Sequence, residues 1–362
     1  MKQIVFLILS IFLFLGCAPK KVVTIPAPQK EVQVKKDEIV QPIIQSVQKH
    51  ELTDEEKIFK VAIIFPSKIV GKYANSTINT IMGYLLYKNE KFEIEAFDSV
   101  NQDFENMKRN FDDIAQKGYT KVIALYPKGA LENIYSIDAT RKMELFLPLI
   151  HKKDSPYRDH NFIYGGISYD DQLSKLLTLS NGANAMFYED SSLGRKLKFA
   201  YDNLVPHSNP VKPVSRIDTK YKRLVEDEKL NGKALMLNTP IIKSSIILSQ
   251  LRAHEIEPNI ILSTQLNYNP LLVSLTQFED RVNFITANSI EKTDDVLTEN
   301  LALLDAEIGY NWVNYASLVG INHFFSWNKD GLIKNHIANN QVQYKVHLYN
   351  STAYGFQKIN IE

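Results

Sequence analysis

The sequence predicts an α/β fold with two doubly wound lobes, each built on a mostly parallel sheet. Three observations predict it. The chain has 362 residues, which is more than one small domain needs. From residue 60 onward, short β-branched and aromatic runs alternate with stretches of helical periodicity, the pattern typical of βαβ units. This alternation restarts after a loop rich in charge and proline at 151–160, so we expect two lobes in series.

The first lobe is expected over residues 60–167. Its opening strand, 61–65, is continuously apolar and ends at Pro66. The helix after it, 76–88, repeats apolar residues at i, i+3, i+4, i+7 and i+8 from Ile78. The other elements expected here are a strand at 92–96 near a sheet edge, a helix at 104–115 closed by Gly118, a strand at 122–126, a helix at 131–137 and a strand at 146–150.

The second lobe is expected over residues 168–291. Its predicted elements are helices at 173–179, 193–204, 241–253 and 270–277, and strands at 185–188, 211–217, 234–237, 260–262 and 282–285.

The last 71 or so residues are expected to complete both lobes. Residues 312–325 are apolar on nearly every face, which predicts a helix buried between layers. Segments 344–348 and 355–361 alternate with period two and predict a closing hairpin. We expect 292–325 to complete the first lobe and 326–362 to complete the second.

Residues 1–16 predict a signal peptide. Lys2 is followed by an apolar run of about 12 residues and then by Gly16, Cys17 and Ala18. This run is shorter than the roughly 20 residues of a bilayer-spanning helix. The segment looks like a bacterial lipoprotein signal, in which Cys17 receives a diacylglycerol and becomes the mature N-terminus. Ala18 in place of an aspartate then implies the outer membrane. An ordinary secreted protein with an incidental Cys17 is the alternative.

Residues 17–59 predict an extended tether that carries the lipid at its start. Between residues 18 and 50 there is no glycine and no aromatic residue, and four prolines are interleaved with Lys, Gln and Val. Such a stretch cannot bury enough apolar surface to offset the entropy of ordering. The apolar doublets at 22–23 and 43–44 leave a docking strand as the alternative.

Composition and motifs exclude several functions. The 42 basic and 41 acidic side chains nearly cancel, so the chain lacks the charge of a nucleic-acid binder. Cys17 is the single cysteine, so no intramolecular disulfide forms. There is no G-x-S-x-G, no phosphate-binding loop, no G-x-G-x-x-G after a strand and no H-E-x-x-H. We therefore expect no enzyme, no cofactor and no metal, although distant residues leave a metal site open.

Polar residues follow the predicted strand ends, where an open α/β sheet binds its ligands. Any one of them is equally suited to a turn or a helix cap. Together they predict a binding site between two lobes. The candidate ligand- or partner-binding residues are Ser67, Lys68, Tyr73, Lys128, Glu189, Asn238, Thr239 and Gln265.

The order of elements resembles the type 1 periplasmic-binding-protein fold, and more narrowly the penicillin-binding protein activator lipoproteins and their amino-acid-binding relatives. The similar segments are 60–67 (KVAIIFPS) with Gly71 and Gly83, 97–98, 121–127 (KVIALYP), 167–172 and 188–195 (YEDSSLGR). Lys68 and Ile69 stand where transport members have a serine- and glycine-rich loop that grips an amino acid, so the resemblance favours protein contact over solute transport.

The sequence therefore predicts a non-catalytic, lipid-anchored protein of the outer membrane, facing the periplasm. Its expected partner is a cell-wall synthesis enzyme or another envelope protein. The alternatives are a receptor for an amino acid, peptide or muropeptide in the interlobe cleft, and a structural scaffold of an envelope machine. A deep polar cleft would favour the small ligand, whereas a plugged cleft beside an exposed apolar patch would favour the protein partner.

Overall fold

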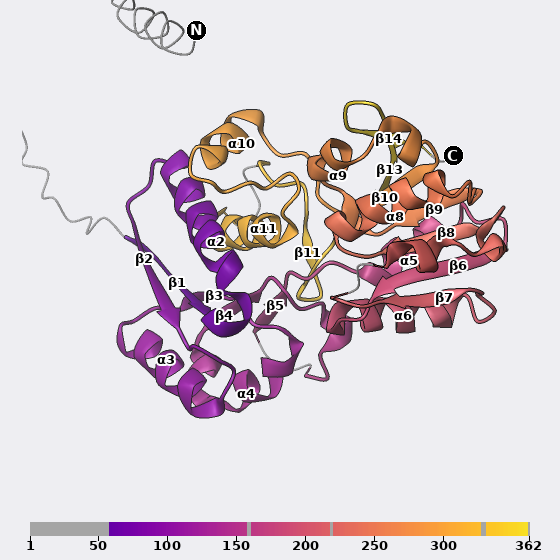
Figure 1. Ribbon diagram of the computed structural model, residues 1–362. Coiled ribbons are helices and arrows are strands. Elements are labelled where there is room, and N and C mark those ends of the chain that lie inside the picture. The colour runs from indigo at the N-terminus through magenta and orange to yellow at the C-terminus, as the bar shows by residue number, and fades with distance from the viewer. Residues whose placement is uncertain (1–57, 158–160, 218–219, 327–330, 361–362) are drawn as a thin grey trace, which may run out of the picture. The chain divides into compact units, whose positions relative to one another are not determined.

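The structure is a computed structural model that describes residues 58–157, 161–217, 220–326 and 331–360 (Figure 1). The predicted signal peptide, Cys17 and nearly all of the predicted tether lie outside the described residues. Within the described ranges, no helix is long and apolar enough to cross a membrane.

The first lobe is built on a seven-stranded sheet of order β11-β12-β5-β4-β3-β1-β2. Strands β12 to β2 pair in parallel, and β11 is antiparallel to β12. Its strands are β1 (Phe59–Phe65), β2 (Phe92–Asp98), β3 (Lys121–Ala124), β4 (Glu144–Leu147), β5 (Phe162–Tyr164), β11 (Ile337–Ala338) and β12 (Gln341–Val342). Its helices are α2 (Ser67–Tyr87), α3 (Phe104–Gln116), α4 (Leu131–Ser136), α10 (Asp295–Ala302) and α11 (Trp312–Ser326).

The second lobe has a seven-stranded sheet of order β14-β13-β10-β9-β8-β6-β7. Five strands run in parallel, and β13 is antiparallel to both of its neighbours. Its strands are β6 (Asn184–Glu189), β7 (Val211–Val214), β8 (Ala234–Asn238), β9 (Ile260–Ser263), β10 (Phe284–Asn288), β13 (His347–Ser351) and β14 (Phe356–Ile359). Its helices are α5 (Tyr169–Leu177), α6 (Ser192–Leu204), α7 (Tyr221–Val225), α8 (Ile241–Ala253) and α9 (Pro270–Leu275).

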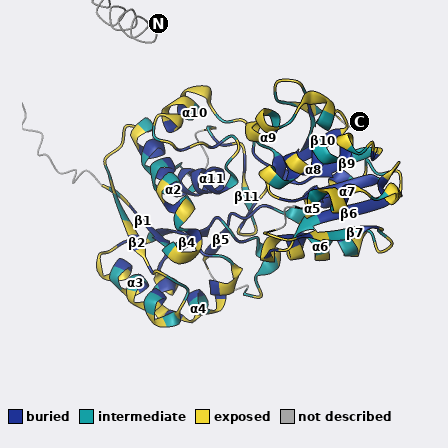
Figure 2. Cartoon of the chain, viewed as in Figure 1, coloured by how far each residue is buried: buried dark blue, intermediate teal, exposed yellow. Residues whose placement is uncertain are grey.

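Helices cover both faces of each sheet, as the burial colours of Figure 2 show. In β1, Val61 and Ile63 face a core shared with α2, α10 and α11, whereas Ala62 and Ile64 face the core under α3 and α4. A strand buried on both faces has no polar alternation, which is why 61–65 is continuously apolar. The second sheet lies in the same way between α8 and α9 on one face and α5 and α6 on the other. The predicted class of two doubly wound lobes with mostly parallel sheets is confirmed.

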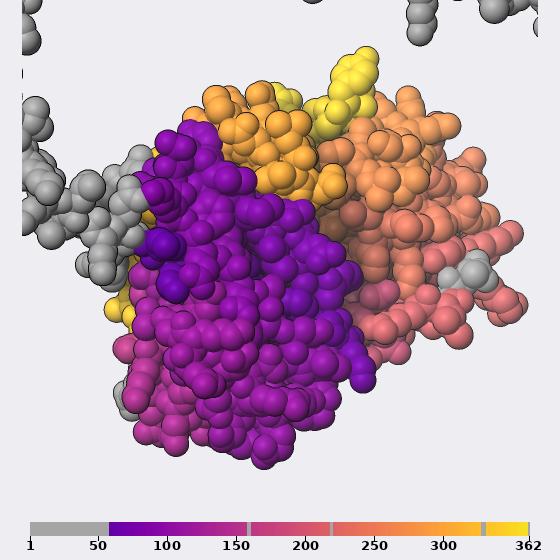
Figure 3. Space-filling view, turned by 90° about the vertical axis from the view of Figure 1, so that its left-hand side faces the viewer, coloured from indigo at the N-terminus to yellow at the C-terminus, as the bar shows by residue number. Residues whose placement is uncertain are grey.

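The chain passes between the lobes three times: between β5 and α5, between β10 and α10, and between β12 and β13. Figure 3 shows the result: residues near 300 (orange) lie on the first lobe (indigo to magenta), and the second lobe meets it along a recess. The third crossing corrects one boundary. We expected 326–362 to complete the second lobe, but β11 and β12 pair into the first sheet, where Tyr164 N–H donates to the Asn340 carbonyl at 2.8 Å.

Other predicted helices and strands differ from the structure in their first or last residues, and two elements were missed. Helix α2 begins at Ser67, nine residues before the predicted start, because Val70, Ala74 and Thr77 extend its buried stripe toward the N-terminus of the helix. The short strand β5 and the helix α10 were missed, and β4 and β10 lie two residues away from their predicted starts. The buried helix α11 and the closing hairpin of β13 and β14 are confirmed.

Candidate functional site

Seven of the eight candidate residues lie at the carboxyl ends of strands or within four residues after them, in both lobes, and Tyr73 lies further along the chain, in helix α2 (Ser67–Tyr87). Ser67, Lys68 and Tyr73 follow β1, and Lys128 follows β3. In the second lobe the remaining four follow β6, β8 and β9: Glu189, Asn238, Thr239 and Gln265.

Ser67 and Lys68 form the first turn of α2 and do not lie in a loop. The Asp98 carboxylate at the end of β2 accepts the backbone N–H groups of Ser67 at 3.0 Å and Val100 at 2.7 Å. Burial acts to raise the pKa of Asp98, but the hydrogen bonds from the Ser67 side chain and from the two backbone N–H groups outweigh it and hold the pKa below its ordinary value. Asp98 therefore caps the helix, and the side chains of Lys68 and Ile69 are exposed on its first turn.

Tyr73 lies where the first lobe meets the second. Its half-buried ring packs against the first core, and the Lys72 ammonium lies 4.6 Å from the ring centre. Tyr169, at the start of α5 in the other lobe, has a pKa raised first by burial and then by the nearby Tyr73.

Lys128 belongs to a group of ion pairs that bridges the lobes. Its ammonium lies 3.8 Å from the Asp154 carboxylate, which pairs with Lys196 of α6 at 2.6 Å. Close by, Lys153 pairs with Asp171 of α5 at 3.2 Å. The segment after β4 therefore holds two helices of the second lobe through charge.

Gln265 is held in a buried amide network. The Gln172 side-chain amide donates to Gln265 Oε1 at 2.6 Å and to Ser289 Oγ at 2.9 Å. In return, Gln265 N–H donates to Gln172 Oε1 at 3.0 Å, and Ser289 N–H donates to Gln265 Oε1 at 3.1 Å. The network ties α5 to the segments that follow β9 and β10.

Asn238 and Thr239 belong to a second buried group beside it. Asn238 Oδ1 accepts both the N–H and the hydroxyl of Thr264 at 3.1 Å, and the Asn267 amide donates to the Thr239 carbonyl at 3.1 Å. The Thr239 hydroxyl shares a hydrogen bond with Ser244 at 2.8 Å. Among the described residues, only Asn238 Nδ2 and Asn267 Oδ1 are buried side-chain polar atoms without a partner.

These contacts close the carboxyl edge of the second sheet. Asn238, Thr239 and Gln265 are 1%, 0% and 8% exposed, so a molecule in the recess does not reach their side chains without rearrangement. Their hydrogen-bonding groups are used mainly by one another, which is the way buried polar groups stabilise a fold.

Glu189 is separate from this network. Its carboxylate pairs with Lys243 of α8 at 2.9 Å, and the same ammonium donates to the Ser215 carbonyl at 2.9 Å. Both side chains are mostly buried, so the pair connects β6 to α8 and the segment after β7.

A small cavity lies among the crossing segments. Its volume is about 40 Å³, far below the roughly 300–1,000 Å³ of typical ligand sites. His151 lies on its wall, and burial lowers the pKa of that imidazole. The lining residues are His151, Ser168, Asp171, Ser289, Gln341, Val342, Gln343, Tyr344 and Val346.

Comparisons with known proteins agree with this architecture. The chain matches no protein-family model and no curated protein sequence. A Rhodospirillum rubrum structure described as a branched-chain amino acid ABC transporter superposes with a TM-score of 0.64 at 11% identity, over 83% of this chain and 100% of that one. The chain has the type 1 periplasmic-binding-protein fold.

Two further structures superpose on this chain with lower TM-scores. LpoA from Haemophilus influenzae superposes with a TM-score of 0.57 at 10% identity, over 86% of this chain and 60% of LpoA. The substrate-binding protein LivJ from Streptococcus pneumoniae, solved in complex with isoleucine, superposes with a TM-score of 0.55 at 11% identity, over 84% of this chain and 100% of LivJ. The chain therefore spans about three fifths of the length of LpoA.

Several residues that organise this type 1 fold were missed from the sequence. Gln172 is the clearest, because it is a fully buried polar residue beside the apolar Leu173 and Leu176 of α5. A glutamine on the apolar side of a predicted helix could have indicated a buried hydrogen-bond network. Asp154 and Lys196 gave no such signal, since exposed charges at unrelated positions do not reveal which of them pair.

In the part of the chain that the structure describes, no group of three or more His, Cys, Asp and Glu side chains is arranged to hold a metal ion. The arrangement is suited to binding through surfaces and to fixing the lobes relative to each other.

Proposed function

We propose that this chain is a non-catalytic, lipid-anchored envelope protein that works by binding another protein, most specifically a cell-wall synthesis enzyme. The observation that carries the proposal is the closed carboxyl edge of the second sheet, where Gln172, Gln265 and Ser289 bond to one another. A receptor for a polar small molecule needs free donors and acceptors there.

The proposal draws support from one likeness. The C-domain of Haemophilus influenzae LpoA, described as a regulator of PBP1A, superposes over 83% of this chain and 100% of that domain with a TM-score of 0.54. At 11% identity the likeness concerns the fold, so the role is carried over here as part of the proposal.

The anchor is proposed at Cys17, with the outer membrane as its site. Multiple acyl chains hold a protein stably at a bilayer, whereas one short chain does not. Cys17→Ser should move the protein from the membrane fraction to the soluble periplasmic fraction. A variant that stays with the membrane would contradict lipid anchoring, and sucrose-gradient separation of the membranes tests the outer-membrane assignment.

The partner is tested by capture of the full-length chain from crosslinked envelopes, followed by mass spectrometry. A cell-wall synthase should be enriched over a mock capture. Recovery of only the abundant envelope proteins would count against the proposal.

A second candidate function is a small-ligand receptor. It draws support from LivJ of Streptococcus pneumoniae, which was solved in complex with isoleucine and superposes over 84% of this chain with a TM-score of 0.55. A ligand at 100 times its Kd should add about 2.7 kcal/mol to the free energy of unfolding. A thermal-shift screen of amino acids, peptides and muropeptides that gives no shift would remove this candidate.

A further inference from the structure

The outer helices of the second lobe expose apolar side chains on adjoining faces. Helix α8 sends Ile247, Leu248 and Leu251 into the core, yet its outer face also carries apolar residues. The exposed members are Ile242 and Ile246 on α8, 63% and 37% exposed, and Leu271 and Leu275 on α9, each 45% exposed. The outer face of a surface helix is ordinarily polar. We call this apolar, exposed surface of the two helices the α8–α9 face.

A groove runs beside these side chains. It has a volume of about 610 Å³ and lies between the second half of α8 and the end of α9. Its walls include Ser249 and Ala253, which continue the spacing of Ile242 and Ile246 along one side of α8. The groove and the exposed apolar residues therefore form one surface.

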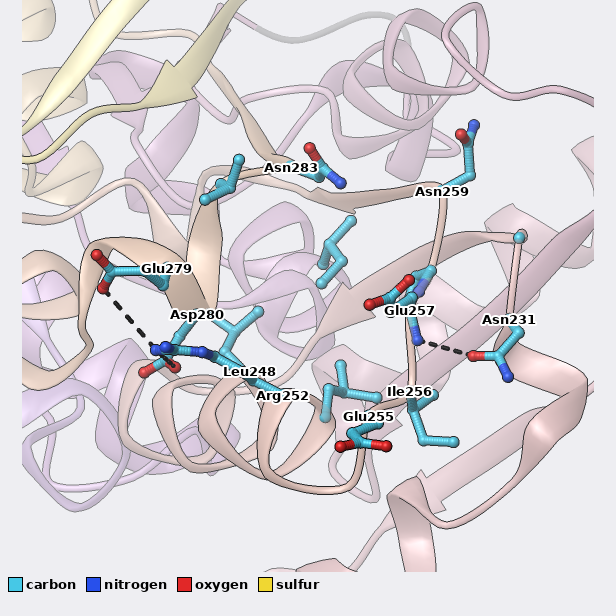
Figure 4. Close-up of a pocket in the computed structure, with 15 residues that line it drawn as sticks. Asn231, Leu248, Arg252, Glu255, Ile256, Glu257, Asn259, Glu279, Asp280 and Asn283 are labelled. Carbon is cyan, nitrogen blue, oxygen red and sulfur yellow. Dashed lines mark hydrogen bonds and ion pairs between the residues drawn. The ribbon is translucent and has the colours of Figure 1, made fainter.

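A larger pocket adjoins the groove (Figure 4). Its volume is about 900 Å³, and Arg252 and Asp280 line both hollows. The pocket is formed where α8 ends and where β8, β9 and β10 begin, at the edge of the sheet opposite the buried amide network. Its apolar lining consists of Leu248, Leu251, Ile256, Pro258, Ile261 and Val282.

The charge of this acidic pocket is one-sided. Four carboxylates line it, from Glu255, Glu257, Glu279 and Asp280, against the single guanidinium of Arg252. Arg252 lies 3.3 Å from Asp280 and 3.8 Å from Glu279, so its charge is already matched. Glu255 and Glu257 are exposed, and among the described residues neither carboxylate has an ion-pair partner.

We propose that the α8–α9 face and the acidic pocket together dock an amphipathic segment of the partner protein. Its apolar side chains would cover Ile246 and Leu275, and a Lys or Arg beside them would enter the pocket between Glu255 and Glu257. This inference rests on the proposed function and names the surface that carries it. Apolar anchors give a helix or strand its affinity in such a groove, and charge fixes its direction.

The charge also excludes two other occupants. An anionic membrane surface would meet unpaired carboxylates of its own sign. Two copies of this chain that met face to face would bring the same carboxylates together, because a two-fold interface pairs a patch with itself. A basic, apolar polypeptide is the occupant that satisfies both the groove and the pocket.

The experiment places a photocrosslinker in the full-length chain in its native envelope. p-Benzoylphenylalanine replaces Ile246, and in a matched control it replaces Phe199, an apolar residue on α6 that is 70% exposed. Position 246 should crosslink one envelope protein, through a segment with apolar residues at helical spacing and at least one Lys or Arg. Position 199 should give a yield at least tenfold lower.

A second pair of variants tests the charge. The double change E255K and E257K, made in the crosslinker protein, should lower the yield from position 246 at least tenfold. E132K, an exposed acid on α4 of the first lobe, is its control and should leave the yield unchanged.

Three results would overturn the inference. They are a crosslink to a second copy of this chain, a crosslinked segment without basic residues, and a yield that charge reversal leaves unchanged. If capture recovers a cell-wall synthase but position 246 does not crosslink it, this surface is wrong and the proposed function stands. If neither position reaches a synthase and capture finds none, the proposed function fails as well.

Discussion

Gln172 and Gln265 bond to each other twice, side chain to side chain at 2.6 Å and backbone to side chain at 3.0 Å. Both residues are buried, and they join α5 to the segment after β9. A buried pair of this kind stabilises mainly because breaking it leaves polar groups without partners.

Gln172→Ala should therefore lower the free energy of unfolding by about 1–3 kcal/mol, since the buried backbone N–H of Gln265 loses its partner and Gln265 Oε1 keeps only the Ser289 N–H. Urea unfolding measures the change. Gln116→Ala, at an exposed position of α3, is the control and should stay within about 0.5 kcal/mol of the wild type. Equal effects at the two positions would show that the network carries no stability.

Two glycine substitutions should act in opposite directions. An added Cβ at Gly194 would overlap the Glu189 carbonyl oxygen, so Gly194→Ala must move α6 away from β6 and should cost about 1–3 kcal/mol. An added Cβ at Gly71 in α2 would meet only Ser67 Cβ, at an ordinary 3.6 Å. Gly71→Ala should therefore gain about 0.5–1 kcal/mol. Thermal unfolding of both variants checks the signs, and a stabilised Gly194→Ala would refute the close approach.

The ion pairs between the lobes should control local opening more than global stability. Asp154 joins Lys196 across the lobes, and the Lys196 side chain is 50% exposed. Asp154→Asn should change the free energy of unfolding by less than about 1 kcal/mol. It should nevertheless speed amide hydrogen exchange at 152–157. Raising the salt concentration should speed exchange there in the wild type and have little effect in the variant. Equal salt responses would show that the Asp154 ion pairs do not restrain this segment.

His151 should make stability depend on pH near neutrality. Burial, helped by Lys153, lowers its pKa below the ordinary value of 6.5, and the carboxylates of Asp171, Asp154 and Asp170 only partly oppose this. The folded state thus prefers the neutral imidazole, so its contribution is present above pH 6.5 and is lost as the pH falls toward the folded pKa. Urea unfolding at pH 7.5 and 5.5 should show a smaller loss for His151→Gln than for the wild type, and equal losses would contradict the assignment.

The fold was predictable where burial gives residues that are close in sequence a regular pattern of apolar side chains. Strand β1 is apolar throughout because both of its faces are covered, and α3 shows one apolar stripe with Met107, Phe111 and Ile114 buried. The start of α2 was not predictable in this way, because the small Ala74 and the polar Thr77 occupy its buried face in place of large apolar residues. Strand β5 has three residues, too few to show a period.

The candidate site was predictable only in outline. Asn238 and Gln265 were predicted from their positions at strand ends. The local sequence does not distinguish a polar side chain that is free to bind a ligand from one that is hydrogen-bonded within the protein. The deciding contact of Gln265 comes from Gln172, 93 positions earlier in the chain. The acidic pocket was missed for the same reason, since Glu255 and Glu279 come together only when α8 packs on the sheet.

The late position of α11 in the chain affects how the protein is made. The Tyr84 hydroxyl of α2 donates to Asn322 Oδ1 of α11 at 2.8 Å, across 238 positions of sequence. Leu318 and Val319 of the same helix fill the core that Val61 and Ile63 begin. A ribosome must therefore release almost the whole polypeptide before the first lobe can close its interior, and such long-range contacts form slowly.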